Sequence, residues 1–241
     1  MTDESGQAPA PKDTDNAALR AQVLAAEHWS LLATRSSIWQ EIFSRTGTFL
    51  TILSATVVAL SLVVQATGFE TNFRIIALLV LPVVLLVGIA TFIRLMEADV
   101  EDAWLLIGMN RLRHAYVELV PDLDRFLVTG HHDDEAGLTQ TYSFRRRLGF
   151  GHFLAGSPVI VGIIDAVLSG VLAVIVCTAL GAPTWLQVTA GLLIALGTAA
   201  ALGTVLHGRV SRFRRAYRPQ FPTPPDTDDK GRERHVHESS E

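Results

Sequence analysis

The chain has very little cysteine and very little lysine. Its single cysteine, Cys177, excludes an intramolecular disulfide, and its apolar surroundings indicate a small packing residue rather than a reactive thiol. Lysine occurs only at Lys12 and Lys230, against 18 arginines. Together with abundant alanine, glycine, leucine and valine, this bias is typical of a GC-rich genome and carries no chemical information.

Familiar targeting and catalytic signals are also missing. Residues 1–16 are acidic and lack the basic region and short apolar core of a signal peptide. The chain contains no phosphate loop, dinucleotide glycine motif, HExxH or GxSxG. We therefore expect a protein that is not an enzyme, with no cofactor, no metal and no nucleic-acid partner.

Four long apolar stretches dominate what is present. Each has about 21 to 24 residues, and a helix needs ~20 residues to cross the ~30 Å hydrocarbon core of a bilayer. The sequence therefore predicts an all-α, multi-pass membrane protein. The four predicted spans are Gly47–Thr67, Arg74–Met96, Pro158–Leu180 and Thr184–His207.

Arginine distribution predicts the orientation. The short connections after the first and third spans carry no Lys or Arg, apart from Arg74 at the edge of the first. Arginines gather instead before spans one and three and after spans two and four, so the positive-inside rule places both termini and the central segment in the cytoplasm. The short outer connections predict two antiparallel helical hairpins, which we expect to form one four-helix bundle in a bacterial plasma membrane.

Residue composition and spacing predict the structure of the remaining segments. Apolar residues at helical intervals predict an amphipathic cytoplasmic helix before span one, and a second helix from Arg94 to about Val120 that Pro121 ends. The tail Pro219–Glu241, rich in proline, is predicted to be disordered. The expected order is tail 1–16, helix 17–46, hairpin 47–96, cytoplasmic helical linker 97–156, hairpin 157–208, and basic stretch with tail 209–241.

Span one carries a polar stripe at helical spacing. Small and hydroxyl residues on one face allow close helix approach, which favours packing inside a bundle. The alternative is a water-accessible stripe that lines a pore in an oligomer. The candidate polar residues of the stripe are Thr51, Ser54, Ser61 and Gln65.

Asp165 is the one acidic residue well inside a predicted span. A carboxylate at this depth is costly and normally faces a partner, a cavity or a proton path. Two interpretations stay open. Asp165 either forms an ion-linked or proton-linked site, or it is a protonated or hydrogen-bonded structural residue, paired for example with a hydroxyl of span one.

Spans three and four carry ladders of small residues spaced by four. Such ladders let two helix backbones approach closely, so we expect these two spans to touch along their length. The predicted packing residues are Gly162, Ala166 and Gly170 in span three, and Gly191, Ala195, Ala199 and Gly203 in span four.

Two charged clusters in the central segment have plain interpretations. Glu97, Asp99, Glu101 and Asp102 are expected to form a solvated helix face, with an acidic ring at a pore mouth as the alternative. The loop 129–137 contains HHDDE, but adjacent residues of a loop do not by themselves make a tetrahedral metal site. We therefore predict a solvated loop.

The stretches EHWSLLATRS, Glu27–Ser36, and FSRTGTFL, Phe43–Leu50, resemble a family of small uncharacterised bacterial integral membrane proteins. That resemblance covers about a third of the chain and implies a membrane location without an established activity. A more distant similarity is to SLATT-type modules, which place a cytoplasmic helix before a two-span hairpin and are proposed to form pores in bacterial conflict systems. This chain differs from them by its second hairpin.

These observations lead to two hypotheses of different classes. The first is a non-enzymatic membrane protein that forms a homo-oligomer in the lipid bilayer, with an ion-conducting or pore-like assembly as its activity. The second is a membrane scaffold that docks a cytoplasmic protein partner on its cytoplasmic helices. A pore requires the span-one stripe or Asp165 to face water, whereas a scaffold requires only exposed apolar surface on those helices.

Overall fold

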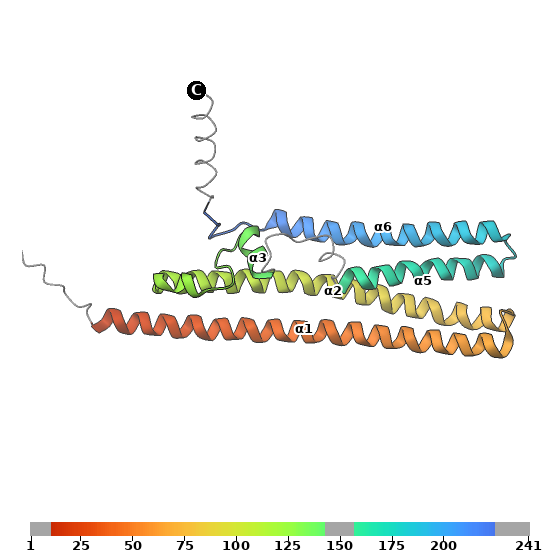
Figure 1. Ribbon diagram of the computed structural model, residues 1–241, viewed down its shortest axis with the longest axis horizontal. Coiled ribbons are helices and arrows are strands. Elements are labelled where there is room, and N and C mark those ends of the chain that lie inside the picture. The colour runs from red at the N-terminus through yellow and green to blue at the C-terminus, as the bar shows by residue number, and fades with distance from the viewer. Residues whose placement is uncertain (1–10, 143–156, 225–241) are drawn as a thin grey trace, which may run out of the picture. The chain divides into compact units, whose positions relative to one another are not determined.

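The computed structural model describes residues 11–142 and 157–224, and this part of the chain is helical without strands (Figure 1). The all-α prediction is confirmed. The predictions for residues 1–10, 143–156 and 225–241 lie outside the described residues. The elements are α1 (Pro11–Thr67), α2 (Thr71–Leu119), the 3-10 helix η1 (Pro121–Phe126), α3 (Glu135–Tyr142), α5 (Ser157–Ala179) and α6 (Thr184–Ala216).

The chain divides into two compact units, and the long helices α1 and α2 contribute to both. Among the described residues, one unit contains 29–105 and 157–217, and we call it the apolar unit. The other contains 11–28, 106–142 and 218–224, and we call it the polar unit. The apolar unit holds the four apolar stretches, and the polar unit holds the histidine-rich loop.

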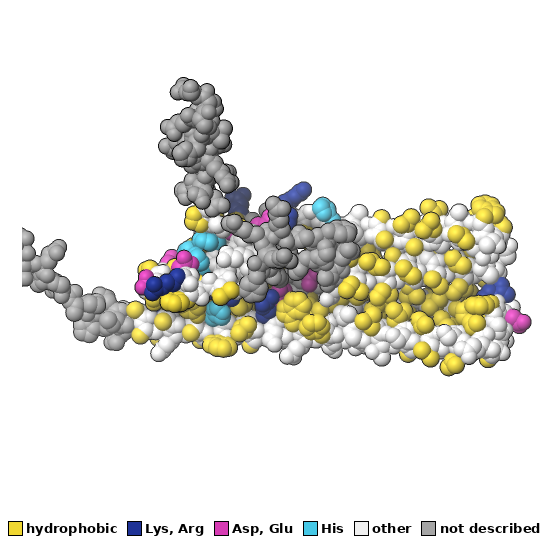
Figure 2. All heavy atoms as spheres, in the orientation of Figure 1, with side chains coloured by type: hydrophobic (Ala, Val, Ile, Leu, Met, Phe, Trp, Pro, Cys, Tyr) yellow, Lys and Arg dark blue, Asp and Glu magenta, His cyan; other side chains and the backbone are white. Residues whose placement is uncertain are grey.

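Four helices, α1, α2, α5 and α6, are long and apolar enough to cross a membrane, as the four apolar stretches of the sequence predict. Large apolar side chains stay exposed along all four, for example Leu79 at 68% and Leu193 at 69% (Figure 2). A water-soluble protein rarely exposes so much contiguous apolar surface. Contact with lipid tails accounts for it.

Glycines end the first and third of these helices. Gly68 and Gly181 have φ angles of 67° and 72°, in the left-handed region that glycine enters without steric penalty. The amide of Gly68 donates to the carbonyl of Val64 at 2.7 Å, and the amide of Ala182 donates to the carbonyl of Cys177 at 3.0 Å. These bonds satisfy carbonyls that a helix end would leave unpaired, so both connections stay short.

The structure differs from expectation at several boundaries. Helix α1 already begins at Pro11, within the predicted tail, and continues without a break into span one. Helix α6 extends through the basic stretch to Ala216, and α3 begins at Glu135, inside the predicted loop. The segment Gln220–Thr223 of the predicted disordered tail is hydrogen-bonded to Asp133 and Asp134.

The core of the apolar unit joins α1, α2 and α5. Phe49 of α1, Phe92 of α2 and Val161 of α5 are each at most 2% exposed and belong to one cluster of buried apolar side chains. Pro82 lies inside α2 and removes one backbone N–H donor from that helix. The buried cluster packs the three helices against one another.

Helices α5 and α6 approach closely where Gly170 of α5 meets Gly191 and Ala195 of α6. A Cβ atom on Gly170 would lie 2.8 Å from the carbonyl oxygen of Gly191 and 2.9 Å from Ala195 Cβ. The hydroxyl of Ser169 donates to Thr198 Oγ1 across the same interface at 2.9 Å. Glycine at position 170 is what allows the two backbones to meet.

The other two residues of the α6 ladder, Ala199 and Gly203, lie outside this interface. Ala199 is exposed, and a Cβ on Gly203 would have no atom within 4 Å. A spacing of four residues drifts by about 40° per step on a helix of 3.6 residues per turn. Thr198 and Leu202 take over the contact with α5, and Leu202 Cδ1 lies 3.7 Å from a Cβ built on Gly162.

This contrast between two glycines is testable. Gly170→Ala should lower the free energy of unfolding by about 1–3 kcal/mol, because the added methyl group meets the Gly191 backbone. Gly203→Ala is the matched control and should be neutral or stabilising by up to about 1 kcal/mol, because it gains helix propensity in open space. Thermal unfolding in detergent micelles measures both. Equal effects would contradict the close α5–α6 approach.

Candidate functional site

Asp165 lies in the middle of the apolar unit, on the buried face of α5. Its side chain is 0% exposed, and neither carboxyl oxygen has a hydrogen-bond partner among the described residues. A buried polar group without a partner costs free energy, and an ionised one costs far more. This carboxyl group is therefore held in place by packing rather than by a specific polar contact.

Gly88 of α2 provides the space for the carboxyl group. A Cβ atom at position 88 would fall on Asp165 Oδ1 and would lie 3.0 Å from Phe49 Cε2. The side chain of Asp165 thus occupies the volume that any other residue at position 88 would fill. Sequence reasoning did not single out Gly88, although a lone glycine inside an apolar span was the available signal.

The polar stripe of span one does not reach this carboxyl group. Thr51, Ser54, Ser61 and Gln65 are all exposed, and the hydroxyls of Thr51 and Ser61 donate to backbone carbonyls of α1 at 2.8 Å and 2.7 Å. Pairing of Asp165 with a span-one hydroxyl, the example offered by one of the two interpretations, is therefore not found in the described part of the chain. The stripe and the carboxyl group are separate features.

Two residues of the stripe, Thr51 and Ser54, line an open groove on the outer surface of α1. Its lining mixes small and hydroxyl side chains with larger apolar ones. Within the apolar unit, this face is turned away from the buried cluster. The groove is lined by Leu50, Thr51, Ser54, Ala55, Val58, Ala59 and Leu62.

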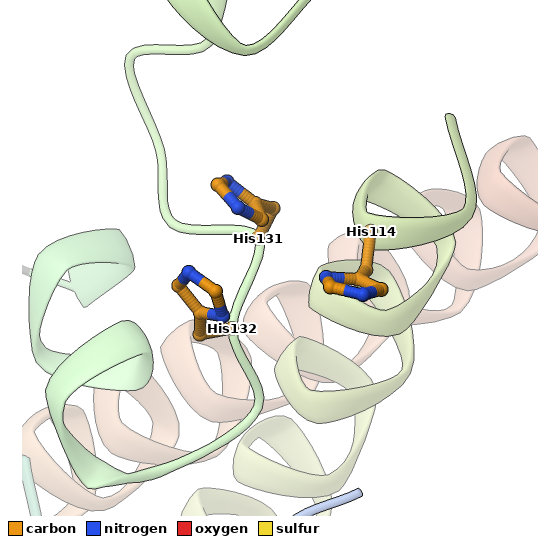
Figure 3. Close-up of side chains that lie close together, drawn as sticks. All are labelled: His114, His131 and His132. Atoms are coloured by element: carbon orange, nitrogen blue, oxygen red, sulfur yellow. The ribbon is translucent and has the colours of Figure 1, made fainter. Parts of the chain in front are cut away.

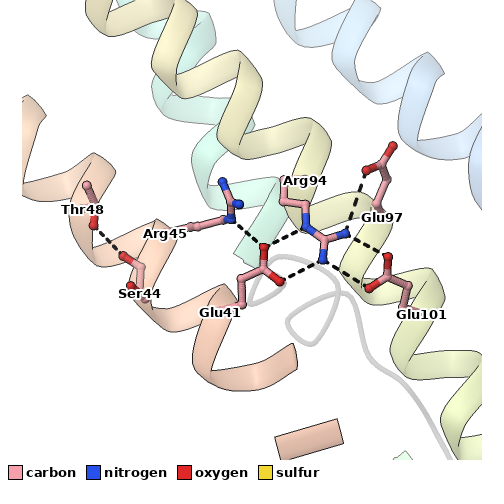
Figure 4. Close-up of polar contacts among 7 residues, drawn as sticks. All are labelled: Glu41, Ser44, Arg45, Thr48, Arg94, Glu97 and Glu101. Carbon is pink, nitrogen blue, oxygen red and sulfur yellow. Dashed lines mark hydrogen bonds and ion pairs between the residues drawn. The ribbon is translucent and has the colours of Figure 1, made fainter. Parts of the chain in front are cut away.

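An ion-pair network joins α1 and α2 beside the apolar stretches (Figure 4). The guanidinium of Arg94 donates to both carboxylate oxygens of Glu41, at 2.9 and 2.8 Å, and to Glu101 at 2.9 Å. Arg45 donates to Glu41 at 2.7 Å. Hydrogen bonds from Arg94 and then Arg45 lower the pKa of Glu41 to about 2, so its carboxylate stays charged.

A second ion pair lies on the same two helices and has a buried carboxylate. Asp102 is 1% exposed and accepts hydrogen bonds from Arg35 Nε at 2.7 Å and from Trp39 Nε1 at 3.2 Å. The acidic run on α2 is therefore not a uniformly solvated face, because Asp102 points into the protein and Glu101 pairs with Arg94. Such buried, paired charges fix the register of α1 against α2.

The polar unit brings together three histidines (Figure 3). His114 lies on α2, and His131 and His132 lie on the loop that follows η1; one ligand nitrogen from each falls within 4.8 Å of the others. The aromatic ring of Phe221 stacks on His114, with centroids 4.2 Å apart. Burial and the neighbouring His132 lower the pKa of His131, which favours the neutral imidazole.

Sequence reasoning did not connect His114 with the HHDDE loop. The loop alone offers adjacent ligand types, and His114 lies in a helix with no motif spacing to it. The fold supplies the missing third residue. The prediction of a merely solvated loop therefore overlooked a cluster of metal-ligand side chains.

The fit between Gly88 and Asp165 can be measured with a double-mutant cycle. Gly88→Ala should lower the free energy of unfolding by about 1–3 kcal/mol, because its methyl group overlaps the carboxyl group. In Gly88→Ala/Asp165→Ala the methyl group has room, so the combined loss should be smaller than the sum by at least about 0.5 kcal/mol. Thermal unfolding of the four proteins in micelles gives the coupling, and strict additivity would refute the contact.

Comparison of the chain with protein-family models, with curated proteins and with solved structures finds no match. The resemblance carried by Glu27–Ser36 and Phe43–Leu50 stays a prediction. The function is therefore argued from the geometry of the chain itself.

Proposed function

We propose that this chain is a non-enzymatic membrane protein that works as an assembly of its own copies, joined along the outer groove of α1. The observation that carries the proposal is the placement of the polar stripe. Thr51, Ser54 and Ser61 lie on an exposed face of an apolar helix, beside Ala55 and Ala59. In hydrocarbon, association of helices depends on close packing and polar contacts, and small side chains provide both.

A second copy of α1 is the occupant that this groove fits best. The large apolar side chains on other exposed faces, such as Leu79 and Val83 of α2 or Leu192 and Leu193 of α6, suit lipid tails. The α1 groove instead combines hydroxyl and alanine side chains with Leu50, Val58 and Leu62, so a second copy of α1 can approach this face closely while the hydroxyls face the space between the two copies. Two identical grooves facing each other also satisfy the symmetry of a homo-oligomer.

Ion conduction is the activity we propose for the assembly. Hydroxyl groups spaced along one helix face offer oxygen ligands to an ion at successive depths of the membrane. Asp165 has no part in this path, because it is buried between α2 and α5 within one copy. Its proposed role is to set the packing of α5 against Gly88.

The proposed topology is two antiparallel transmembrane hairpins in a bacterial plasma membrane, with both termini and the central segment cytoplasmic. Gly68 and Gly181 then mark the outer connections. The ion pairs of Arg35 and Arg94 lie toward the cytoplasmic ends of the spans, together with the arginines at the end of α6. Retention of arginine on this side follows the positive-inside rule.

A second candidate function is a membrane scaffold that docks a cytoplasmic protein. Leu19 and Val23 support it, because they lie one turn apart near the start of α1 and are 60% and 61% exposed. An amphipathic partner helix would cover such a pair. Loss of partner binding in Leu19→Ser/Val23→Ser, with self-association intact, would favour this function over conduction.

Two adjacent valines test the self-association. Val58 lies in the α1 groove and Val57 beside it, and they are 59% and 56% exposed. In a Cys177→Ala background, Val58→Cys should form a disulfide-linked dimer in oxidised membranes because two grooves face each other, whereas Val57→Cys should stay monomeric. Denaturing electrophoresis without reductant reads out both, and equal cross-linking at the two positions would count against the groove.

Conduction is then measured separately on the same face. Vesicles that contain the protein should release trapped K⁺, and Ser54→Leu should stop this release by filling the groove. Val57→Leu adds one methylene group on the neighbouring face and should leave the flux unchanged. Vesicles no leakier than protein-free ones would remove conduction from the proposal while leaving the cross-linking result to judge self-association.

Single cysteines test the topology. In the Cys177→Ala background, Glu70→Cys should react with a membrane-impermeant maleimide in intact cells, because it lies at the proposed outer connection. Asp122→Cys, on the equally exposed η1, should react only after the membrane is permeabilised. The reverse pattern would invert the orientation, and labelling of both in intact cells would overturn the hairpin.

A further inference from the structure

The histidine cluster has the donor set of a transition-metal site. His114, His131 and His132 place one ligand nitrogen each within 4.8 Å of the others. Tetrahedral zinc with Zn–N bonds of ~2.0–2.1 Å requires nitrogens roughly 3.4 Å apart. The three imidazole rings lie side by side, two from the loop and one from α2, and each can turn about two side-chain torsions (Figure 3).

The loop that carries two of these histidines is firmly held. Asn110 of α2 donates to the carbonyl of His132 at 2.7 Å. The next residue, Asp133, is 0% exposed, pairs with Arg111 at 2.8 Å and accepts the amide of Phe221 at 2.8 Å. A loop fixed from both sides presents its side chains in one arrangement, and a binding site needs this preorganisation.

Close packing also fixes the path of the loop. A Cβ atom on Gly137, at the start of α3, would fall on the carbonyl oxygen of His132, and one on Gly130 would lie 2.5 Å from the carbonyl oxygen of Gly137. Asp134 accepts the amide of Gly137 at 2.9 Å and so closes the turn. Consecutive residues in an extended strand point apart, whereas the ring centroids of His131 and His132 lie 4.2 Å from each other.

Two imidazole nitrogens in the cluster are buried without a hydrogen-bond partner, His114 Nδ1 and His132 Nδ1. Buried polar atoms normally have a partner, so each such atom calls for an explanation. His131 Nδ1 lies 3.3 Å from Asp124 Oδ1, which leaves its Nε2 free to bind a cation. A carboxylate that orients a histidine in this way is typical of metal sites.

We propose that His114, His131 and His132 bind a divalent transition-metal cation, with Zn²⁺ as the best-matched ion. Neutral imidazole suits zinc, copper and nickel, and three protein ligands leave a fourth position for water. Glu118 Oε1 lies 3.9 Å from His114 Nε2, the nitrogen that stays off the metal when Nδ1 binds it, and so helps to orient the ring. Stacking of Phe221 on His114 explains why the cluster is packed. It does not satisfy either buried nitrogen, whereas a metal ion does.

Metal binding would connect three parts of the polar unit. The ion joins α2 to the loop, and Asp133 joins that loop to Gln220 and Phe221 near the end of α6. Its occupancy would therefore be expected to stabilise the polar unit. This role is independent of the α1 groove, so neither proposal depends on the other.

The experiment uses the full chain, purified in detergent and stripped with a chelator. Dialysis against Zn²⁺ followed by elemental analysis should give one tightly held ion per chain, and Co²⁺ should give the intense visible bands of a tetrahedral site. His114→Ala should weaken binding at least about tenfold and abolish the tetrahedral spectrum. Asp124→Asn, a positioning change, should weaken binding by about 10- to 100-fold with an unchanged circular dichroism spectrum.

Three histidines outside the cluster supply the controls for the binding experiment. His28 stacks on Tyr116 outside the cluster, and His28→Ala should retain full binding. His235→Ala/His237→Ala should also retain it, which excludes chelation by the tail. If His114→Ala loses its helical circular dichroism, His131→Ala decides the matter. Unchanged Zn²⁺ affinity in a folded His114→Ala or His131→Ala protein, or no Zn²⁺ held by the wild-type chain, would overturn the proposal.

Discussion

The structure depends first on one constraint: a backbone inside hydrocarbon must satisfy its own hydrogen-bonding groups. Long helices meet this constraint, and α1 and α2 continue as helices well past their apolar stretches. Because the hydrophobic effect does not hold helices together inside a bilayer, association there requires close packing and polar contacts. The α5–α6 contact at Gly170 and Gly191 is an example of close packing, and the hydrogen bond from Ser169 to Thr198 is an example of a polar contact.

Beyond the apolar stretches, ion pairs rather than close packing hold α1 against α2. Arg94 ties Glu41 to Glu101, and Arg35 pairs with the buried Asp102. These bonds set the register of two long helices that small-residue contacts alone would leave free to slide. Asp165, the one acidic residue within the four apolar stretches, has no such partner, and its carboxyl group fits into the space that Gly88 leaves. A buried carboxyl group is thus stabilised by an ion pair at Asp102 and accommodated by a space of matching shape at Asp165.

Much of the fold could be predicted because hydropathy and helix punctuation are local properties. The four spans, the end of α2 before Pro121 and the glycine-containing connections all follow from residues close together in the chain. The contacts of the candidate sites could not be predicted in this way. The α6 ladder looked like one continuous interface, but its spacing of four drifts around the helix, so Ala199 and Gly203 leave the contact. Asp165 was recognised as exceptional, but Gly88 lies on another helix, and a lone glycine inside an apolar span does not reveal which residue it meets.

By itself, the sequence determined that this protein is helical, that four helices are apolar enough to cross a membrane, and which polar residues lie within them. Those results depend only on composition and on the period of the helix. Tertiary structure decided which way the polar residues face: the stripe of α1 outward, Asp165 inward against Gly88, and Asp102 into an ion pair. It also decided that His114 meets His131 and His132. Each of these depends on the rotation and register of one helix against another, which distant side chains set together.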